Sequence, residues 1–162
     1  MVPKTSVERV RAALLAAGHA DTITEFPEGT RSAADAAAAI GCEVAQIAKS
    51  IVFRARGADG DRPALVIASG VNRVDISKVA TLLGVTLKRA DGDWVREQTG
   101  FAIGGVAPLG HLAPPLLVFD RDLLALHPIW AAAGSPRHVF ATEAAVLARI
   151  TSAVVADVRD EG

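Results

Sequence analysis

The sequence has 162 residues, of which 51% are hydrophobic and 22% are charged, and its formal net charge is −1. This length and composition suit a folded domain with a proper core and exclude a disordered chain. The nearly neutral charge excludes a globally basic nucleic-acid-binding protein, although a local basic patch would be enough to bind a nucleic acid.

The sequence lacks the features of membrane-spanning, secreted, disulfide-bonded and metal-binding proteins. No apolar run reaches the roughly 18 residues that a membrane-spanning helix needs, and residues 1–11 lack the basic and then apolar pattern of a signal peptide. Cys42 is the only cysteine, which excludes an internal disulfide and a cysteine-based metal cage. The histidines lack the spacing of a helical zinc pair. We therefore expect a cytoplasmic protein with no membrane contact and no metal.

The first half of the chain alternates between predicted helices and strands. Val7, Val10 and Leu14 form an apolar stripe that predicts the first helix. The strands at 50–56 and 64–69 are expected to pair as a β-hairpin. In chain order the predictions are a helix at 6–17, a strand at 22–26, a helix at 32–41 that Ser32 caps, a helical turn at 43–48, and strands at 50–56 and 64–69 joined by a polar turn at 57–63.

The second half continues the alternation. The predictions are helices at 75–83 and 91–98, strands at 85–88, 116–119, 129–133, 138–141 and 153–158, and a helix from 142 to about 149. Asp120 is expected to cap the turn that follows it. At least two hairpins among these elements predict an α/β (α+β) domain with a mixed sheet, and not a purely parallel one. The whole of 1–162 is expected to be one domain with its core in about 5–158.

Residues 100–111 form the most informative segment. It holds four glycines and a proline and carries no formal charge. Glycine lets another molecule come close to backbone N–H groups, and an apolar surface loop of this kind usually lines a site. A tight turn between buried strands is the alternative. The segment matches neither a phosphate-binding P-loop nor a dinucleotide fingerprint.

Lys49 is the charged residue with the clearest functional pattern. It lies where the predicted helical turn becomes a buried strand. A lysine in an apolar run either extends to the rim or stands in a cleft, where it binds an anion such as a phosphate or a developing oxyanion. A local phosphate track is a further hypothesis, with a solvated surface as its alternative; its residues are Arg54, Arg56, Arg73 and Lys78.

Ser135 and His138 are the second candidate pair. Their spacing invites a nucleophile and base interpretation, but no acid is placed in the sequence to orient the histidine. A turn whose hydroxyl or backbone binds a ligand is the preferred interpretation, and a serine hydrolase is kept as an alternative.

Three segments together resemble a known family. Residues 48–53 (AKSIVF), 100–110 (GFAIGGVAPLG) and 133–135 (AGS) are similar in order and spacing to the YbaK-type aminoacyl-tRNA deacylases. This superfamily includes the editing domain inserted in bacterial prolyl-tRNA synthetases. The resemblance implies a mixed, mostly antiparallel, barrel-like sheet surrounded by helices. It also implies a translation-fidelity hydrolase that removes a wrong amino acid, small in size, from tRNA such as that for proline.

The resemblance also implies roles for individual residues. Lys49, Gly104 and Gly105 would be catalytic, through contact with the substrate and through a loop that holds the reacting carbonyl or the attacking water. No metal and no cofactor are implied; aminoacyl-tRNA is the implied partner, with an aminoacyl-tRNA synthetase as a second candidate. Ser50 stands where some relatives carry asparagine, so it bears on the amino acid accepted. The substrate-binding residues would be Ser50, Gly100, Phe101, Ile103, Val106, Ala107, Pro108, Gly134 and Ser135. A non-catalytic module that binds a tRNA acceptor end or a synthetase is the alternative.

Overall fold

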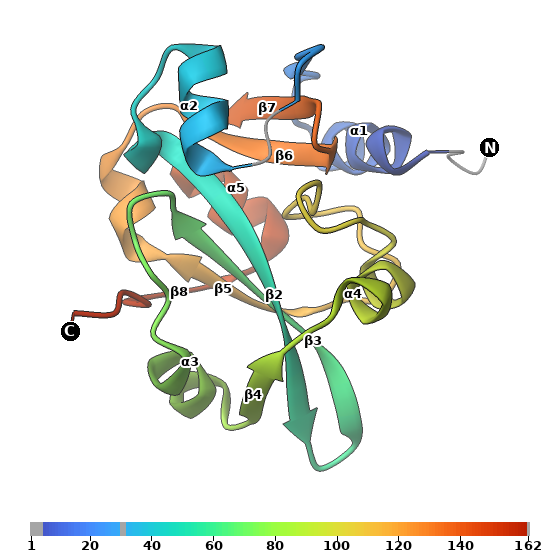
Figure 1. The fold of residues 1–162 in the computed structure, drawn as a ribbon, viewed down its shortest axis with the longest axis vertical. Helices are drawn as coiled ribbons and strands as arrows, with labels where there is room; N and C mark the ends of the chain where they lie inside the picture. The colour runs from blue at the N-terminus through green and yellow to red at the C-terminus, as the bar shows by residue number, and fades with distance from the viewer. Residues whose placement is uncertain (1–4, 30–31, 162) are drawn as a thin grey trace.

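The structure, a computed structural model, describes residues 5–29 and 32–161 (Figure 1). Within these ranges eight strands form one sheet in the order β1-β7-β6-β2-β3-β5-β8, with β4 attached to β2. The strands are β1 (Ile23–Glu25), β2 (Ile47–Gly57), β3 (Gly60–Ser69), β4 (Thr86–Arg89), β5 (Leu116–Asp120), β6 (Ile129–Ser135), β7 (His138–Thr142) and β8 (Val154–Ala156). The helices are α1 (Ser6–Ala16), α2 (Ala33–Ile40), α3 (Ile76–Leu83), α4 (Gly92–Thr99) and α5 (Ala144–Thr151), with 3-10 turns η1 (Val44–Gln46) and η2 (Arg121–Ala125).

The sheet is mixed and mostly antiparallel, as the sequence predicts. The pairs β1/β7, β2/β3, β2/β4 and β6/β7 are antiparallel, whereas β2/β6, β3/β5 and β5/β8 are parallel. Both predicted hairpins, β2/β3 and β6/β7, are present. The parallel pairs arise where helices connect strands that are distant in the chain.

One edge of β2 is divided between two partners. It pairs with β6 only at Ile47 and Ala48, and with β4 only from Phe53 to Arg56. Between these contacts, residues 49–52 face no strand of the described chain on that edge. We call this stretch the β2 split. Figure 1 shows β6 near one end of β2 and β4 near the other. The split matters because its residues are among those that line the cavities described below.

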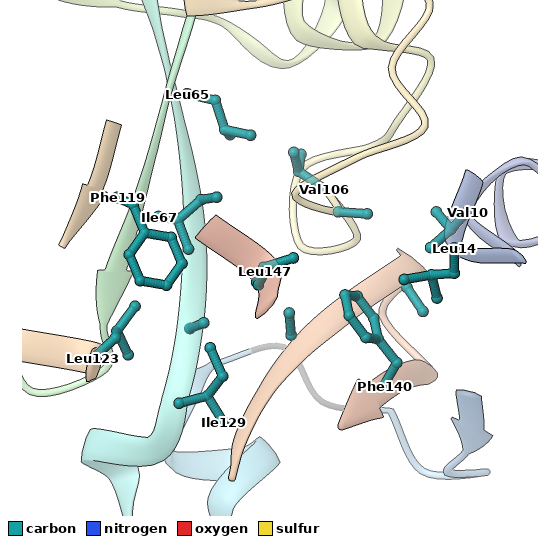
Figure 2. Packing of buried hydrophobic residues seen from close by; sticks show 14 of the residues in the cluster. Val10, Leu14, Leu65, Ile67, Val106, Phe119, Leu123, Ile129, Phe140 and Leu147 are labelled. Carbon is teal, nitrogen blue, oxygen red and sulfur yellow. The ribbon is translucent and has the colours of Figure 1, made fainter. Parts of the chain in front are cut away.

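The core lies on both faces of β2 and β3. Leu65 and Ile67 belong to the larger cluster, which also holds the aromatic residues Phe101, Phe119 and Phe140. The neighbouring residues Ala64 and Val66 point to the other face, against α3. Figure 2 shows the larger cluster, in which Val106 of the loop lies among core side chains. This alternation along β3 is the expected pattern of a strand buried on both faces.

The helix and strand boundaries differ from the predictions in a few places. β2 begins at Ile47 and not at residue 50, so Lys49 lies inside a strand and not at a helix–strand junction. The hairpin turn contains only residues 58 and 59, because the ladder continues to the Gly57 and Gly60 pair. The last helix begins at Ala144 because Thr142 pairs in β7. In each case cross-strand pairing extends a strand beyond its local sequence signal.

Candidate functional site

A cavity of about 320 Å³ lies where β6 leaves β2. It is lined from four directions: the start of α2, the first residues of β2, the loop after α4, and the β6/β7 hairpin. Its walls are mostly small and apolar, with five alanines among the residues that line it. The lining residues are Ser32, Ala33, Ala36, Ile47, Ala48, Lys49, Ser50, Ile103, Gly104, Val106, Trp130, Ala131, Ala132 and Val139. We call this the first cavity.

Lys49 is the one charged residue among the described residues that line the first cavity. Partial burial lowers the pKa of its ammonium group below the usual value, the Asp120 carboxylate opposes this change, and Arg73 adds to it. Loss of water around a charged amine disfavours its charged form. An anionic ligand in the cavity would therefore meet a cation that is short of compensating contacts.

Ser50 carries a polar group that the protein itself leaves unused. Its Oγ is buried and has no hydrogen-bond partner within the described residues. Ser50 also lines a second cavity of about 410 Å³, which continues along β2. The two cavities share Ser50, Ile103, Gly104 and Val106. A buried hydroxyl without a partner costs free energy, so Ser50, which lines both cavities, is a candidate ligand-binding residue.

Arg9 of α1 holds both ends of the 100–111 loop. Its Nη2 donates to the Gly100 carbonyl at 2.8 Å, and its Nε donates to the Gly110 carbonyl at 3.2 Å. The guanidinium carbon also lies 4.9 Å from the centre of the Phe101 ring. A Cβ on Gly100 would come within 2.3 Å of the Arg9 guanidinium, so only glycine permits this contact. No local pattern indicates this role for Arg9, because its partners are about 100 positions away.

His111 closes the loop from inside. Its Nε2 donates to the Ala107 carbonyl at 2.6 Å, and its ring meets the Phe101 ring edge to face. Its Nδ1 is buried with no hydrogen-bond partner in the described chain. Burial lowers the pKa of His111 below its usual value, and Arg9 adds to this effect while the Ala107 hydrogen bond opposes it. His111 is thus a core histidine and not a ligand of the cavity.

The loop presents its backbone to the first cavity at Gly104, whose φ of +95° favours glycine. The N–H groups of Gly104 and Val106 donate to no other described residue, whereas the N–H of Gly105 donates to the Ala102 carbonyl at 3.0 Å. Gly105 has a different role. A Cβ there would lie 2.7 Å from the Ser135 Cα, so this glycine lets the loop pack directly on the β6/β7 hairpin.

Ser135 and His138 are connected to an acid that the sequence did not place. The Ser135 Oγ lies 2.6 Å from the His138 Nδ1, and the His138 Nε2 lies 3.1 Å from a Glu25 carboxylate oxygen. The expectation that no acid orients His138 is therefore wrong, because the pairing of β1 with β7 sets Glu25 opposite His138. The Ser135 Oγ also accepts the Arg137 N–H at 3.0 Å, and Ser135 lines neither of the two cavities.

Asp120 forms the centre of a buried polar cluster behind Lys49. It caps the η2 turn through the Asp122 N–H, as predicted, and it is fully buried. Its other oxygen accepts the Ser69 N–H at 3.0 Å and the Asn72 side-chain amide at 2.8 Å. These bonds satisfy the buried carboxylate, which also attracts Lys49.

The structure divides the predicted site residues into two groups. Those that line the first cavity are Lys49, Ser50, Ile103, Gly104 and Val106. The others are not among the residues that line it: Gly100, Phe101, Gly105, Ala107, Pro108, Gly134 and Ser135. Phe101 is fully buried, so it is a packing residue of the loop and does not line the cavity. The missed lining residues Trp130, Ala131 and Ala132 gave no signal beyond a predicted strand.

Metal-ligand clusters and membrane-spanning helices are absent from the described ranges. No three His, Cys, Asp or Glu side chains gather there as metal ligands do. No described helix combines the length and hydropathy needed to cross a membrane. Burial raises the pKa of the free Cys42 thiol, which disfavours the thiolate.

Comparisons with known proteins identify one matching family model and a relative of similar length. The model of the family described as "Aminoacyl-tRNA editing domain" matches residues 27–150. A protein of Bacillus subtilis (strain 168), the uncharacterized protein YwhH, is 32% identical over 130 residues, which are 80% of this chain and 81% of that protein.

Two solved structures share the fold over nearly the whole chain. One, "a putative trans-editing enzyme for prolyl tRNA synthetase", has a TM-score of 0.87 and 43% identity, and the match covers 99% of both chains. The other, a scaffold used for computational grafting of linear epitopes, has a TM-score of 0.88 and 40% identity, covering 97% of this chain and 99% of the scaffold.

Proposed function

The chain belongs to the aminoacyl-tRNA editing domain family, and from this premise we propose that it hydrolyses the ester that joins a wrong amino acid to tRNA. One observation carries the proposal: Lys49, Ser50 and Gly104 line the same cavity, and neither the Ser50 hydroxyl nor the Gly104 amide has a hydrogen-bond partner among the described residues. These are a cation, a hydrogen-bonding group and an oxyanion donor, which suit an activated ester.

The chemistry needs no side-chain nucleophile. A water oxygen attacks the ester carbonyl carbon, the bond from that carbon to the ribose oxygen breaks, and a proton passes to the ribose oxygen as it leaves. The products are the free amino acid and tRNA with its terminal hydroxyl restored. The Gly104 and Val106 amides, together with Lys49, stabilise the negative charge that develops on the carbonyl oxygen. Position and electrostatics are enough because an aminoacyl ester is already reactive.

The walls of the first cavity favour a small amino acid. Alanines line it from α2, β2 and β6, and Trp130 and Ile47 limit its extent. Apolar walls of this kind discriminate mainly by size. The neighbour whose name refers to prolyl tRNA synthetase supports tRNA for proline as the substrate and that synthetase as a candidate partner.

The experiment that tests this proposal is a panel of mischarged tRNAs. We expect the protein to release a small amino acid from at least one of them, and Lys49→Ala to lower kcat/KM by about 10²-fold or more. Release is measured from the loss of labelled amino acid on precipitated tRNA.

Lys78→Ala is the matched control. Its ammonium group pairs with Asp157 at 3.1 Å on the surface, so its loss should leave the activity unchanged. Equal rates for the Lys49→Ala variant and the unchanged protein would remove Lys49 from the mechanism. Tight binding of tRNA with every ester left intact would favour the non-catalytic module instead.

A second candidate function, hydrolysis by a serine nucleophile, is favoured by the chain of hydrogen bonds from Ser135 through His138 to Glu25. A nucleophilic serine is usually activated by a histidine base, which a carboxylate in turn orients. A fluorophosphonate probe distinguishes the two candidates. Labelling of Ser135, together with loss of ester release in Ser135→Ala, would support the serine mechanism. No labelling would dismiss it.

A further inference from the structure

Three hollows follow one another along β2. The first cavity lies at residues 47–50 and the second cavity at residues 50–53. A third hollow of about 300 Å³ is lined by Arg54, Arg56, Asp61, Lys88 and Arg89; we call it the basic groove. Arg89 lines both the second cavity and the basic groove. Each hollow therefore shares at least one lining residue with the next one along β2.

The middle hollow has the chemistry of a base-binding site. Its walls are mainly aliphatic and aromatic side chains from β2, α3, α4 and the loop. They include Val52, Phe53, Val74, Ile76, Ala90, Val95, Ile103 and Val106. Phe53 is the one aromatic residue among them, and an apolar hollow of this kind can take up an unstacked nucleobase.

The basic groove has the chemistry of a phosphate-binding site. It holds four cations and one carboxylate, which leaves a net charge of +3. Asp61 and the Trp94 ring fix Arg54: the Arg54 Nε lies 2.6 Å from an Asp61 oxygen, and its guanidinium carbon lies 5.0 Å from the ring centre. Lys88 and Arg89 are exposed and form no ion pair within the described chain. They are thus available to an outside anion.

We propose that the 3′-terminal nucleotides of the tRNA lie along β2. This proposal rests on the proposed function. The ester occupies the first cavity, the terminal nucleoside the second cavity, and the phosphates of the preceding nucleotides the basic groove. From residue 49 to residue 55 a strand extends about 20 Å, which is enough for more than the terminal nucleoside. Of the phosphate track expected from the sequence, Arg54 and Arg56 line the basic groove. Lys78 pairs with Asp157 instead, and the further cations of the groove are Lys88 and Arg89.

The test compares two substrates that carry the same ester. One is full-length mischarged tRNA, and the other is the aminoacyl ester of adenosine alone. We expect Lys88→Ala/Arg89→Ala to raise KM for the tRNA by about 3- to 10-fold without a change in kcat, and to raise KM for the adenosine ester by less, since only Arg89 also lines the second cavity. The slope of log(1/KM) against log salt for tRNA should also become shallower by about 0.7 for each phosphate that the variant no longer neutralises. Equal KM and equal salt slope for the variant and the unchanged protein would overturn the proposal.

The matched control is Arg11→Ala/Arg149→Ala, which removes the same charge from residues that line none of the three hollows. It should change neither KM nor the salt slope. Ala90→Phe tests the middle hollow, since a bulky ring there should raise KM for both substrates. An unchanged KM in a folded Ala90→Phe variant would exclude the second cavity as the nucleoside site.

Failure of this proposal is distinguishable from failure of the proposed function. If the unchanged protein hydrolyses no ester, the proposed function fails, and the basic groove is then tested by fluorescence anisotropy with uncharged tRNA. Weaker binding by Lys88→Ala/Arg89→Ala than by Arg11→Ala/Arg149→Ala would still support the groove. Equal binding by the two variants would reject it.

Discussion

At the scale of single residues, the site depends on polar groups that the fold leaves without partners. The Ser50 hydroxyl is buried and unpaired in the described chain, whereas the Ser69 hydroxyl, on the paired strand β3, donates to the Ala45 carbonyl at 2.7 Å. The two serines therefore make a natural comparison. The Ser69 hydroxyl serves the protein's own structure, and we propose that the Ser50 hydroxyl binds a ligand.

We predict that Ser50→Ala changes stability and activity in opposite directions. Removal of an unsatisfied buried hydroxyl should leave the free energy of unfolding unchanged or raise it by up to about 1 kcal/mol. At the same time kcat/KM should fall by about tenfold, because the substrate loses a hydrogen bond. Urea unfolding and ester release from mischarged tRNA measure the two effects.

Ser69→Ala is the control for this prediction. It should lower the free energy of unfolding by about 1 kcal/mol, since it removes the hydrogen bond to the Ala45 carbonyl. A Ser50→Ala variant that is also destabilised, with its kcat/KM unchanged, would show that the Ser50 hydroxyl serves only the fold.

At the scale of elements, the candidate site depends on a loop with little regular structure of its own. Residues 100–111 are held by α1 through Arg9, by the core through Phe101, and by the β6/β7 hairpin through the close approach of Gly105 to Ser135. Only the middle of the loop, with Ile103 62% exposed, faces the cavities. This arrangement gives a fixed backbone at Gly104.

We predict that Arg9→Ala loosens the loop. The variant lacks two hydrogen bonds from a charged donor, so the free energy of unfolding should fall by about 1–3 kcal/mol. Backbone amides in 100–111 should exchange with deuterium faster, and kcat should fall more than KM changes, because the oxyanion donors are no longer held in place. Hydrogen exchange followed by mass spectrometry measures the first effect directly.

Arg11→Ala on the same helix is the control. Arg11 pairs with Asp21 at 2.8 Å, and about 40% of each side chain is exposed, so the pair should contribute under about 1 kcal/mol. If both variants leave hydrogen exchange in the loop equally unchanged, Arg9 does not hold the loop.

At the scale of the whole molecule, β2 and β3 connect the two large core clusters with the three hollows. The two large core clusters lie on their opposite faces, and the three hollows follow β2. We therefore expect residues 5–158 to unfold as one cooperative unit. The groups with lowered pKa values then set how this unfolding depends on pH.

We predict that the free energy of unfolding falls as the pH is lowered from 7.5 to 5. The pKa of His111 in the folded state lies below its usual value of 6.5, so the unfolded chain binds the proton first as the pH falls. The decrease begins near pH 6.5 and is complete below the folded pKa. Asp21, Asp61 and Asp157 have pKa values lowered from 3.8, so their stabilisation disappears only at more acidic pH.

His111→Gln isolates this effect, since glutamine can still donate to the Ala107 carbonyl but does not titrate. Urea unfolding at pH 7.5 and pH 5 should show a single transition for both proteins and a smaller pH dependence for the variant. An equal pH dependence in the two proteins would contradict the assignment to His111.

Local sequence signals predict most of the elements and several of the residues that line the first cavity. Gly41, Gly84 and Gly100 end their helices in the left-handed conformation, as a glycine after a helix predicts. Lys49 and the 100–111 loop were identified because a cation and four glycines are unusual in apolar surroundings. These signals are readable because each depends on a few neighbouring residues.

Only the tertiary structure decided which distant residues meet. Arg9 contacts Gly100 and Gly110, Glu25 meets His138, and the gap between β4 and β6 opens the split in β2. Strand pairing and helix packing set these contacts across many tens of residues, and no local pattern encodes them. The sequence by itself thus marks Lys49 and the 100–111 loop, while the fold decides which distant residues line a cavity with them.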